Sequence, residues 1–572
     1  MLLKILRTCL KANPARPVRR AMALRQQGDL PAATGVLRDA ARQFPHDAVI
    51  AVNLALVLLE QNQADAGAAE LERAMALDPA NAAAHYNYAN LLRVSGRQEE
   101  ALPHYRLATQ GPAPVAQAQQ ELMFSLLEFC AWDEAGRVAE GLRATCRQKN
   151  ADWPRGIAPL TAVYLGLDDS TCKEVAAWHA AEAARDVAVL HAAPAAEGAR
   201  LRIGYLSPDC RDHPVGHLLG AALPLHDRNR CVVFVYSYGA DDQSASRRAI
   251  ERGVEHFVDI ATLSDAAAAA RIAADGVQVL IDLAGHTSGG RPGILARRPA
   301  AVQAHYLGYP ATTGAAYLDY FITDAVVTPS ACEAAFSEQL AFVPDCFMVG
   351  GGPPPPAALQ PTRASQGLPA QAMVYSSFIN AARISRDVFA LWMEILRAVP
   401  DSVLWLKQSH AAVVANLRAE AVRHGVDASR LCFAPRVAGR AEHLARIALS
   451  DLSLDTIGWH CGHSTTNETL WTGVPVLTAE GGHFAARVGC SLLTAAGLPE
   501  MIARDARDYV AIATRLGLER ESCAALKHKL AANRQHAAFF DQRRLVAGLE
   551  TVYLEMWRQH RAGLRPQGIA PR

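Results

Sequence analysis

The stretch DLSLDTIGWHCGHSTTNETLWTGVPVLT, Asp451–Thr478, decides the fold of the larger part of this 572-residue chain. It begins with a short apolar run, passes through a loop rich in glycine, serine and threonine, and continues as the helical segment NETLW before a second apolar run, VPVLT. A strand, a helix and a second strand in this order form the unit from which parallel sheets are built. The stretch therefore predicts an α/β lobe whose polar loop follows the carboxyl end of a strand.

Similar apolar runs stand on both sides of this stretch, separated by loops and helical segments. Seven precede a Gly/Pro-rich segment at Gly350–Gly367: LRIGYLS, CVVFVYSYG, HFVDI, VQVLIDLAGH, AVQAHYLGYP, DYFITDA and QLAFVPD. Three more, AMVYSSF, SVLWLK and RLCFAP, follow it. Because apolar strands that alternate with helices indicate parallel sheets, we expect two Rossmann-like lobes. The first spans 199–349, a linker spans 350–370, and the second lobe with the C-terminal helices spans 371–572.

The first third of the chain repeats with a period of 34 residues. Four columns agree at this spacing: Ala21, Ala55 and Ala89; Leu24, Leu58 and Leu92; Gly28, Asn62 and Gly96; Ala33, Gly67 and Ala101. Pro45 and Pro79 close two units, since proline cannot continue a helix. The spacing resembles tetratricopeptide repeats, so we expect an α-helical superhelix over 1–115 that binds extended protein segments in a groove. The period blurs after residue 112, and residues 116–198 are predicted to be further repeat-like and linking helices.

Composition excludes several classes of protein. Lys and Arg total 57 against 56 for Asp and Glu, so the basic excess of a nucleic-acid-binding protein is missing. No apolar run approaches the ~20 residues that cross a bilayer. The N-terminus has an apolar start followed by basic residues, the reverse of a secretory signal, and we interpret it as mature sequence. The 12 cysteines form no CxxC pair, which favours a reducing compartment and no structural zinc. We expect a soluble, cytoplasmic protein without membrane or nucleic-acid partners.

The loop within Asp451–Thr478 is a candidate phosphate site. Between the strand and the helix lie Gly462, His463, Ser464, Thr465 and Thr466. Free N–H groups and hydroxyls at this position favour an anion such as a diphosphate. Glu468, in the first turn of that helix, is placed to bind a ribose diol. The alternative is an ordinary Ser/Thr N-cap.

Basic side chains follow two other strands of the second lobe. Arg383 comes after AMVYSSF, and Arg440 with His443 comes after RLCFAP. Carboxyl ends of parallel strands meet at one edge, so these groups predict a polyanion pocket, with solvated surface arginines as the alternative.

In the first lobe, Asp209, His213 and His217 follow the first strand. A histidine at this edge suits a general base because its ordinary pKa lies near neutrality. The HxxxH spacing also allows a metal pair, but Pro214 argues against a regular helix at His213 and no third ligand is evident. For His286, after VQVLIDLAG, we expect structural hydrogen bonding.

The motifs that are missing narrow the chemistry. No GxGxxG opens the first lobe, and there is no GxxxxGK[ST] and no Asp-x-Asp after a strand. These absences disfavour nicotinamide enzymes, P-loop NTPases and metal-bound nucleotide sugars. A two-lobed glycosyltransferase with a metal-free diphosphate pocket fits what remains, and we expect no cofactor.

Several specific motifs follow the repeats: LRIGYLSPD, HPVGH, RPAAVQAHYLGYPATTGAAYLDYFITD, PDSVLWL and LSLDTIGWHCGHSTTNETLWTGVPVLT. Together with the repeats, these motifs resemble the protein O-GlcNAc transferase family and its SPINDLY-like relatives. The resemblance covers nearly the whole chain. It implies a repeat superhelix joined to a GT-B type enzyme. Such an enzyme moves N-acetylglucosamine from UDP-GlcNAc to Ser/Thr hydroxyls of intracellular proteins, with inversion and without a metal ion.

The same resemblance implies a set of site residues. His213 is the base or a sugar contact, with Asp209 its rival. Arg383 is the basic phosphate ligand. The remaining donor-binding positions are Asn380, Arg440, His443, His463, Ser464, Thr465, Glu468, Leu307, Gly308 and Pro310.

Several departures leave the donor open. Arg383 stands where animal enzymes have lysine, and Glu468 where they have aspartate. The segment PLTAVYLG, Pro159–Gly166, lacks a histidine that those enzymes place before the first lobe. TTNE and AGHT are closer to the SPINDLY-like branch, which uses GDP-fucose, whereas HPVGH is closer to the GlcNAc branch. The alternatives are therefore a GDP-fucose-dependent protein O-fucosyltransferase, or a repeat scaffold whose transferase module binds nucleotide without turnover.

Overall fold

The structure is a computed structural model that describes residues 13–110, 115–148, 153–190, 200–350 and 360–570. Our expectations for the first twelve residues and for the proline tract of the linker lie outside these residues. The chain divides into two compact units. One comprises residues 1–126 and 133–144, and the other comprises 127–132 and 145–572.

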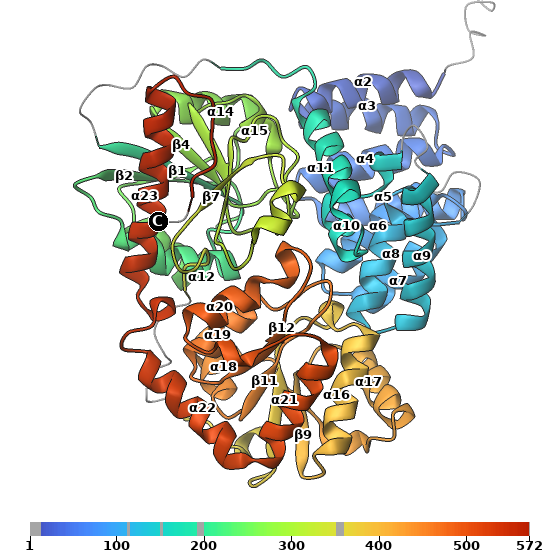
Figure 1. Ribbon diagram of the computed structural model, residues 1–572. Coiled ribbons are helices and arrows are strands. Elements are labelled where there is room, and N and C mark those ends of the chain that lie inside the picture. The colour runs from blue at the N-terminus through green and yellow to red at the C-terminus, as the bar shows by residue number, and fades with distance from the viewer. Residues whose placement is uncertain (1–12, 111–114, 149–152, 191–199, 351–359, 571–572) are drawn as a thin grey trace, which may run out of the picture. The chain divides into compact units, whose positions relative to one another are not determined.

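The first unit contains successive helix pairs that follow the predicted period (Figure 1). The backbone between the two helices of a pair turns through a left-handed residue, with φ of 84° at Gly28, 60° at Asn62 and 78° at Gly96. These residues form one of the predicted columns, and glycine and asparagine tolerate this conformation better than other residues do. The repeat is confirmed for the pairs α2 (Ala15–Gln26) and α3 (Leu30–Gln43), α4 (Ala48–Glu60) and α5 (Ala64–Leu77), and α6 (Ala82–Val94) and α7 (Gln98–Ala108).

Small residues bring the paired helices together. Ala21, Ala55 and Ala89 are fully buried. At Gly67 an added Cβ would lie 2.7 Å from two side-chain carbons of Leu59, closer than carbon atoms can pack. The alanine-rich composition of this region therefore reflects close helix packing.

The period continues into a fourth unit, beyond the point where the sequence pattern blurs. Cys130, 34 residues after Gly96, has φ of 52° and separates α8 (Ala118–Glu128) from α9 (Trp132–Gln148). Met123, Leu126 and Ala135 occupy the other three columns and are buried. Larger side chains at Met123 and Cys130 hide the pattern in the sequence. The helices α10 (Pro159–Tyr164) and α11 (Asp169–Ala184) follow in the second unit.

The first lobe is built on a parallel sheet of seven strands in the order β3-β2-β1-β4-β5-β6-β7. The strands coincide with the seven apolar runs before the linker: β1 (Leu201–Ser207), β2 (Cys231–Ser237), β3 (His256–Asp259), β4 (Val279–Asp282), β5 (Val302–His305), β6 (Tyr320–Thr323) and β7 (Gln339–Phe342). Its helices are α12 (Pro214–Ala222), α13 (Ala245–Arg252), α14 (Asp265–Ala274) and α15 (Pro292–Ala296). The order reverses between β1 and β4, which is where ligands bind in doubly wound sheets.

The second lobe repeats this order in a parallel sheet of six strands, β10-β9-β8-β11-β12-β13. Its strands are β8 (Met373–Ser377), β9 (Ser402–Lys407), β10 (Leu431–Ala434), β11 (Leu452–Leu454), β12 (Val476–Ala479) and the two-residue β13 (Ile502–Ala503). Its helices are α16 (Arg386–Ala398), α17 (Ala411–Arg423), α18 (Arg440–Ile447), α19 (Ser464–Trp471), α20 (Val488–Ala495), α21 (Ala506–Leu518) and α22 (Arg520–Asn533). The corresponding reversal lies between β8 and β11, so the predicted fold class is confirmed.

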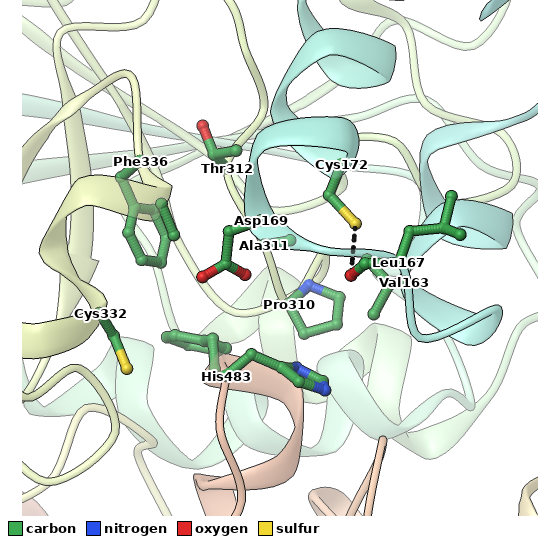
Figure 2. A pocket seen from close by; sticks show the side chains of 12 residues that line it. Val163, Leu167, Asp169, Cys172, Pro310, Ala311, Thr312, Cys332, Phe336 and His483 are labelled. Carbon is green, nitrogen blue, oxygen red and sulfur yellow. Dashed lines mark hydrogen bonds between the residues drawn. The ribbon is translucent and has the colours of Figure 1, made fainter. Parts of the chain in front are cut away.

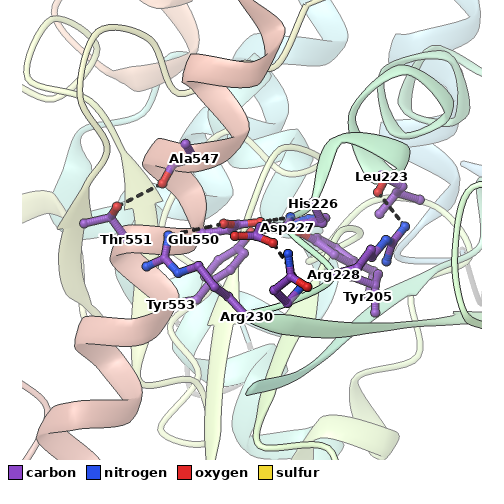
Figure 3. A network of polar contacts seen from close by, with 12 residues as sticks. Tyr205, Leu223, His226, Asp227, Arg228, Arg230, Ala547, Glu550, Thr551 and Tyr553 are labelled. Atoms are coloured by element: carbon purple, nitrogen blue, oxygen red, sulfur yellow. Dashed lines mark hydrogen bonds and ion pairs between the residues drawn. The ribbon is translucent and has the colours of Figure 1, made fainter. Parts of the chain in front are cut away.

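The last helix, α23 (Gln542–Arg561), packs on the first lobe, although it belongs to the range that we expected to accompany the second. Figure 3 shows the buried polar network that fixes it. Nδ1 of His226 lies 2.9 Å from Glu550, and the hydroxyl of Tyr553 lies 3.2 Å from that of Tyr205. Beyond the helix, Ile569 pairs with Ala341 at the edge of the sheet. An amphipathic pattern shows that a helix is covered, but does not show by which lobe.

Two expectations from composition can be compared with the fold. No helix in the described residues is both long and apolar enough to span a membrane. The described cysteines are free thiols, and most are buried.

Candidate functional site

Most predicted site residues lie on loops that follow central strands. In the second lobe these loops follow β8 and β11, and in the first they follow β1 and β4, which flank the reversal, and the neighbouring β5. Bound nucleotides lie beyond the carboxyl ends of such strands in doubly wound folds. Arg440 and His443 differ, because they follow the edge strand β10.

Asp455, immediately after β11, shapes the loop that leads to α19. Its carboxylate accepts hydrogen bonds from the backbone N–H groups of Gly462 at 2.6 Å and Thr456 at 2.9 Å, and from the Thr478 hydroxyl at 3.0 Å. Burial raises the pKa of Asp455 to about 6, because the hydrogen bonds only partly replace water. A Cβ on Gly462 would lie 2.4 Å from the Thr466 hydroxyl, so the loop requires glycine there.

The N-terminus of α19 is open. Its N-cap, His463, makes no side-chain capping bond, and the N–H groups of Ser464 and Thr465 donate to no described residue. Free N–H groups and the helix dipole favour an anion at this position. Thr466 differs from its neighbours, since its hydroxyl points inward and lies 3.3 Å from Asp455. The structure thus gives this predicted binding residue an internal partner.

Arg383 stands on a short turn that neighbouring residues hold from both sides. Asn380 caps the turn, accepting from the N–H of Ala382 at 2.9 Å. On the other side, the indole of Trp132 donates to the carbonyl of Ile384 at 2.9 Å. Asn380, predicted to bind the donor, therefore also positions the arginine.

The guanidinium of Arg383 has no carboxylate partner among the described residues. Its charge lowers the pKa values of His460 and His463, after burial, which is the larger cause. His463 has a pKa of about 3, and the nitrogen Nε2 of its neutral ring donates to the carbonyl of Ala485 at 3.0 Å. An unpaired cation thus lies close to the open end of α19, as a diphosphate site requires.

Arg440 and Glu468, predicted separately, are bound to each other. Nε of Arg440 lies 2.8 Å from Oε1 of Glu468. Nδ1 of His443 accepts from Arg446 at 3.0 Å, and burial lowers the pKa of His443 to about 4, so its remaining nitrogen is a neutral donor. The sequence analysis did not find Lys407, at the end of β9, whose pKa is lowered by burial and by Arg436 and Arg446.

In the first lobe, His213 is the N-cap of α12. Its Nδ1 accepts from the N–H of Val215 at 3.3 Å and lies 3.5 Å from Asp209. Burial lowers the pKa of His213, and the charge of Asp209 offsets only part of this effect. His213 and Asp209 are therefore neighbours, and the neutral imidazole can accept a proton.

The other two histidines of this edge have separate partners. His217 lies within α12, and its Nε2 is 2.7 Å from Asp212. His286 is hydrogen bonded at 2.7 Å to the carbonyl of Thr313, which confirms the structural role that we expected. Among the described residues, no group of three or more His, Cys, Asp and Glu side chains is arranged to hold a metal ion.

The loop after β5 carries Leu307, Gly308 and Pro310 in a constrained path. Leu307 has φ of 69°, and a Cβ on Gly308 would lie 2.0 Å from the carbonyl oxygen of Leu283. Such strain persists where the surroundings hold the backbone, often at functional sites. Pro310 borders a small pocket that Val163 and His483 also line (Figure 2).

The segment without the expected histidine, α10, also reaches the loop before α19. The ring centroid of Tyr164 lies 4.4 Å from that of Trp459 and 5.9 Å from that of His460. His460 was not predicted as a site residue. Its Nδ1 is buried without a hydrogen-bond partner in the described part of the chain. The only sequence signal for it was its place in the strand-end loop.

The chain has two doubly wound lobes, and the second has an open, cationic helix end beyond its central strands. These features define a two-lobed glycosyltransferase of the GT-B type. Tetratricopeptide repeats precede the two lobes. A repeat model matches residues 70–102. The family model for glycosyl transferase family 41 matches residues 147–353 and 351–549, and the chain belongs to this family.

Relatives and a solved structure agree with this assignment. The chain is 33% identical over 464 residues to the probable UDP-N-acetylglucosamine–peptide N-acetylglucosaminyltransferase SEC of Arabidopsis thaliana, covering 78% of this chain and 47% of that protein. It is 31% identical to SPINDLY of the same plant, covering 64% and 40%. A mutant of the Thermobaculum terrenum O-GlcNAc transferase is 27% identical with a TM-score of 0.68, covering 97% of this chain and 100% of that one. The chain spans less than half the length of these curated plant relatives.

Proposed function

We propose that this protein transfers N-acetylglucosamine from UDP-GlcNAc to serine and threonine hydroxyls of other proteins, with inversion and without a metal ion. The observation that carries the proposal is the position of Arg383. Its charge is not neutralised by any described carboxylate and lies beside the open N-terminus of α19. The relatives named as UDP-N-acetylglucosamine–peptide transferases support this choice of sugar and acceptor.

In the proposed reaction, the donor diphosphate binds at Ser464 and Thr465, and Arg383 balances its charge. The acceptor oxygen forms a bond to the anomeric carbon while the bond from that carbon to the diphosphate oxygen breaks, and UDP leaves with the electron pair. Charge that grows on the leaving group meets donors already in place, which is the most effective form of electrostatic catalysis.

The acceptor proton passes to His213 in this scheme. While Nδ1 accepts from Val215, the ring proton of the neutral imidazole is on Nε2, which then cannot act as a base. Moving that proton to Nδ1, where Asp209 lies 3.5 Å away, frees Nε2 to accept. Asp209 thus orients and stabilises the imidazolium in the way that a carboxylate supports a catalytic histidine.

The repeats supply the acceptor in this proposal. Stacked helix pairs form extended surfaces that bind peptide segments, and four pairs in register suit a flexible acceptor chain. We propose that the protein acts in the cytoplasm, on intracellular acceptors.

A donor panel tests the proposal against the fucosyltransferase alternative. Thermal unfolding is measured with UDP, GDP, UDP-GlcNAc and GDP-fucose, each with a chelator present. We expect UDP and UDP-GlcNAc to raise the melting temperature more than the guanine nucleotides do, since ligands that bind the folded state stabilise it. A larger shift with GDP-fucose would favour O-fucosyl transfer.

Mass spectrometry of acceptor proteins tests the scaffold alternative. After incubation with UDP-GlcNAc and chelator, acceptors should gain the mass of one or more N-acetylhexosamines. Nucleotide binding with no mass gain on any acceptor would indicate a scaffold with an inactive module.

A further inference from the structure

The turn between the two helices of the fourth repeat, residues 129–132, packs against the second lobe and belongs to the same compact unit as that lobe. Its side chains Phe129, Cys130 and Trp132 are buried. The side-chain amide of Asn416, in α17, donates to the carbonyl of Phe129 at 2.9 Å. This turn of the repeats is therefore built into the lobe that carries the open end of α19.

The same turn reaches the backbone on both sides of Arg383. Nε1 of Trp132 donates to the carbonyl of Ile384 at 2.9 Å in a buried contact, and no other described residue donates to that carbonyl. On the other side, Sγ of Cys130 lies 3.9 Å from the carbonyl oxygen of Ala381. Burial raises the pKa of Cys130 to about 12, so it is a neutral thiol and a weak donor. The repeat turn thus holds two carbonyls between which Arg383 lies.

The indole ring of Trp132 also packs on the helix that follows Arg383. Its centroid lies 5.4 Å from that of Phe389, in α16, with an angle of 46° between the rings. Phe389 is fully buried. The indole cannot move away from the Ile384 carbonyl without losing this packing, so the direction of its N–H group is fixed.

Backbone support is important for Arg383 because no described carboxylate holds its guanidinium. A charged group that must meet a ligand is effective when it is held in place beforehand, and a shift of about 1 Å can cost about 100-fold in rate. Contacts that served only to attach the repeats could fall anywhere along α16 or α17. Those of Cys130 and Trp132 fall on the carbonyls that flank this arginine.

We propose that Trp132 is a positioning residue for Arg383, and that the fourth-repeat turn, residues 129–132, forms part of the support of the donor site. This role rests on the proposed function, because it requires a diphosphate at Arg383. It makes donor binding depend on a residue of the repeats that acts through the backbone of the second lobe.

A double-mutant cycle measured by calorimetric titration tests this role, with whichever of UDP and GDP binds the wild-type protein more tightly. Trp132→Phe keeps a ring against Phe389 but removes the N–H donor, and it should weaken binding about fivefold, the equivalent of one hydrogen bond. Arg383→Ala should weaken binding about tenfold or more. In the Arg383→Ala background, Trp132→Phe should have almost no further effect, because the side chain that it positions is gone. A purely structural role would give the same loss in both backgrounds.

Asn416→Leu loosens the fourth-repeat turn from the side of α17 and leaves Trp132 in place. It removes the hydrogen bond to the Phe129 carbonyl. We expect a loss of nucleotide affinity of about threefold that is absent in the Arg383→Ala background. This variant carries the cycle if thermal unfolding shows that Trp132→Phe does not fold.

Tyr375→Phe is the matched control. Tyr375 also donates from a buried ring to a backbone carbonyl of the second lobe, that of Ala513 in α21, at 2.7 Å. The variant keeps the ring and removes the donor, so it should lower the melting temperature as Trp132→Phe does but leave nucleotide affinity unchanged. An equal loss of affinity in the two variants would overturn the positioning role.

The outcomes separate the two claims. If the wild-type protein binds neither UDP nor GDP, the proposed function fails and the positioning role fails with it. If it binds one of them, but Trp132→Phe binds it as tightly as the wild-type protein or loses the same affinity in both backgrounds, only the positioning role is overturned.

Discussion

Asp282 and Asp455 occupy the same place in the two lobes, at the carboxyl end of the strand beside the reversal of order. Each accepts backbone N–H groups of the turn that follows. Their other partners differ. Asp282 lies 2.9 Å from Nδ1 of the buried His305, whereas Asp455 has only the hydroxyls of Thr466 and Thr478.

This difference shows how one fold is used for two purposes. The pair of Asp282 and His305 ties two strands of the first lobe together. Asp455 instead holds the loop around Gly462 that leads to the open end of α19, and its raised pKa of about 6 shows that burying the ionised form is costly. A cost of this kind is common where a site is kept in shape for a ligand.

The loops that follow the carboxyl ends of the strands form the rim of each lobe, and the two rims carry different charged groups. The second lobe presents Arg383 and Lys407, neither of which forms an ion pair within the described residues, although the charge of Glu468 acts on Lys407. The first lobe presents Asp209 with His213, and Asp212 with His217. One rim is therefore cationic, and the other carries two contacts between a histidine and an aspartate.

The largest effect should come from His213→Ala, which separates proton transfer from donor binding. Loss of a general base costs about 100- to 10,000-fold in turnover. The Kd for UDP should stay within about twofold, because the proposed diphosphate ligands, Arg383, Ser464 and Thr465, belong to the second lobe. Turnover by mass spectrometry and Kd by calorimetry measure the two quantities.

His213 would lose its assigned role if the variant kept wild-type turnover. In that case Asp209→Asn becomes the decisive variant. A large loss there, with none for His213→Ala, would make Asp209 the base.

A smaller effect is expected from Gly462→Ala, which breaks the loop held by Asp455. The new Cβ would lie 2.4 Å from the Thr466 hydroxyl and 2.7 Å from the Asp455 carboxylate, so the loop must shift. We expect donor affinity to fall about tenfold, the equivalent of one charge-assisted hydrogen bond. Calorimetric titration with UDP measures the change.

Gly482→Ala serves as the control for this variant. An added Cβ at Gly482 meets no atom within 4 Å, and the residue is exposed in the same lobe. Equal losses of affinity in the two variants would mean that the shape of the Gly462 loop does not control binding.

The smallest effects are expected from Asp282 and Asp455, which should differ in how much each contributes to the free energy of unfolding. Asp282→Asn weakens a buried contact between a carboxylate and a histidine and should lower the free energy of unfolding by about 2 kcal/mol without changing UDP affinity. Asp455→Asn should cost less stability at pH 7 but weaken UDP binding. Denaturant unfolding and calorimetry on both variants test this contrast, and the reverse pattern would contradict it.

Asp455 should also make the free energy of unfolding depend on pH. The folded pKa of Asp455, about 6, lies above its ordinary value of 3.8, so the folded state binds the proton more tightly than the unfolded state does. This group's contribution to stability is therefore largest at low pH and is lost as pH rises from about 4 to about 6. Subtracting the Asp455→Asn profile from the wild-type profile should show this loss, and parallel profiles would exclude it.

Much of the fold could be predicted from local patterns. Each apolar run contains one of the strands β1–β12, because a strand buried on both faces must be apolar throughout. The two-residue strand β13 is too short for such a signal. Repeat-like helices were expected after residue 115, but their 34-residue register was not visible because Met123 and Cys130 replace the small and left-handed residues of the earlier units.

The site could be predicted less completely. The loops after the strands identified Arg383, Arg440 and Glu468 as candidates. The hydrogen bond between Arg440 and Glu468 could not be predicted, because it depends on the packing of α18 against α19. Asp455 ends a strand and reads as part of it, so its support of the loop became visible only in three dimensions. The inward turn of the Thr466 hydroxyl is likewise a property of the folded loop.

The account depends most on the cationic rim of the second lobe, and Arg383→Ala tests it most directly. The rate of N-acetylhexosamine transfer from UDP-GlcNAc to an acceptor is measured by mass spectrometry with chelator present. Arg397→Ala, on an exposed face of α16 in the same lobe, is the control. The predicted result is transfer by the wild-type and control proteins and a loss of roughly 100-fold or more in Arg383→Ala, as for other transition-state electrostatic contacts. Transfer by Arg383→Ala at the wild-type rate would contradict the account.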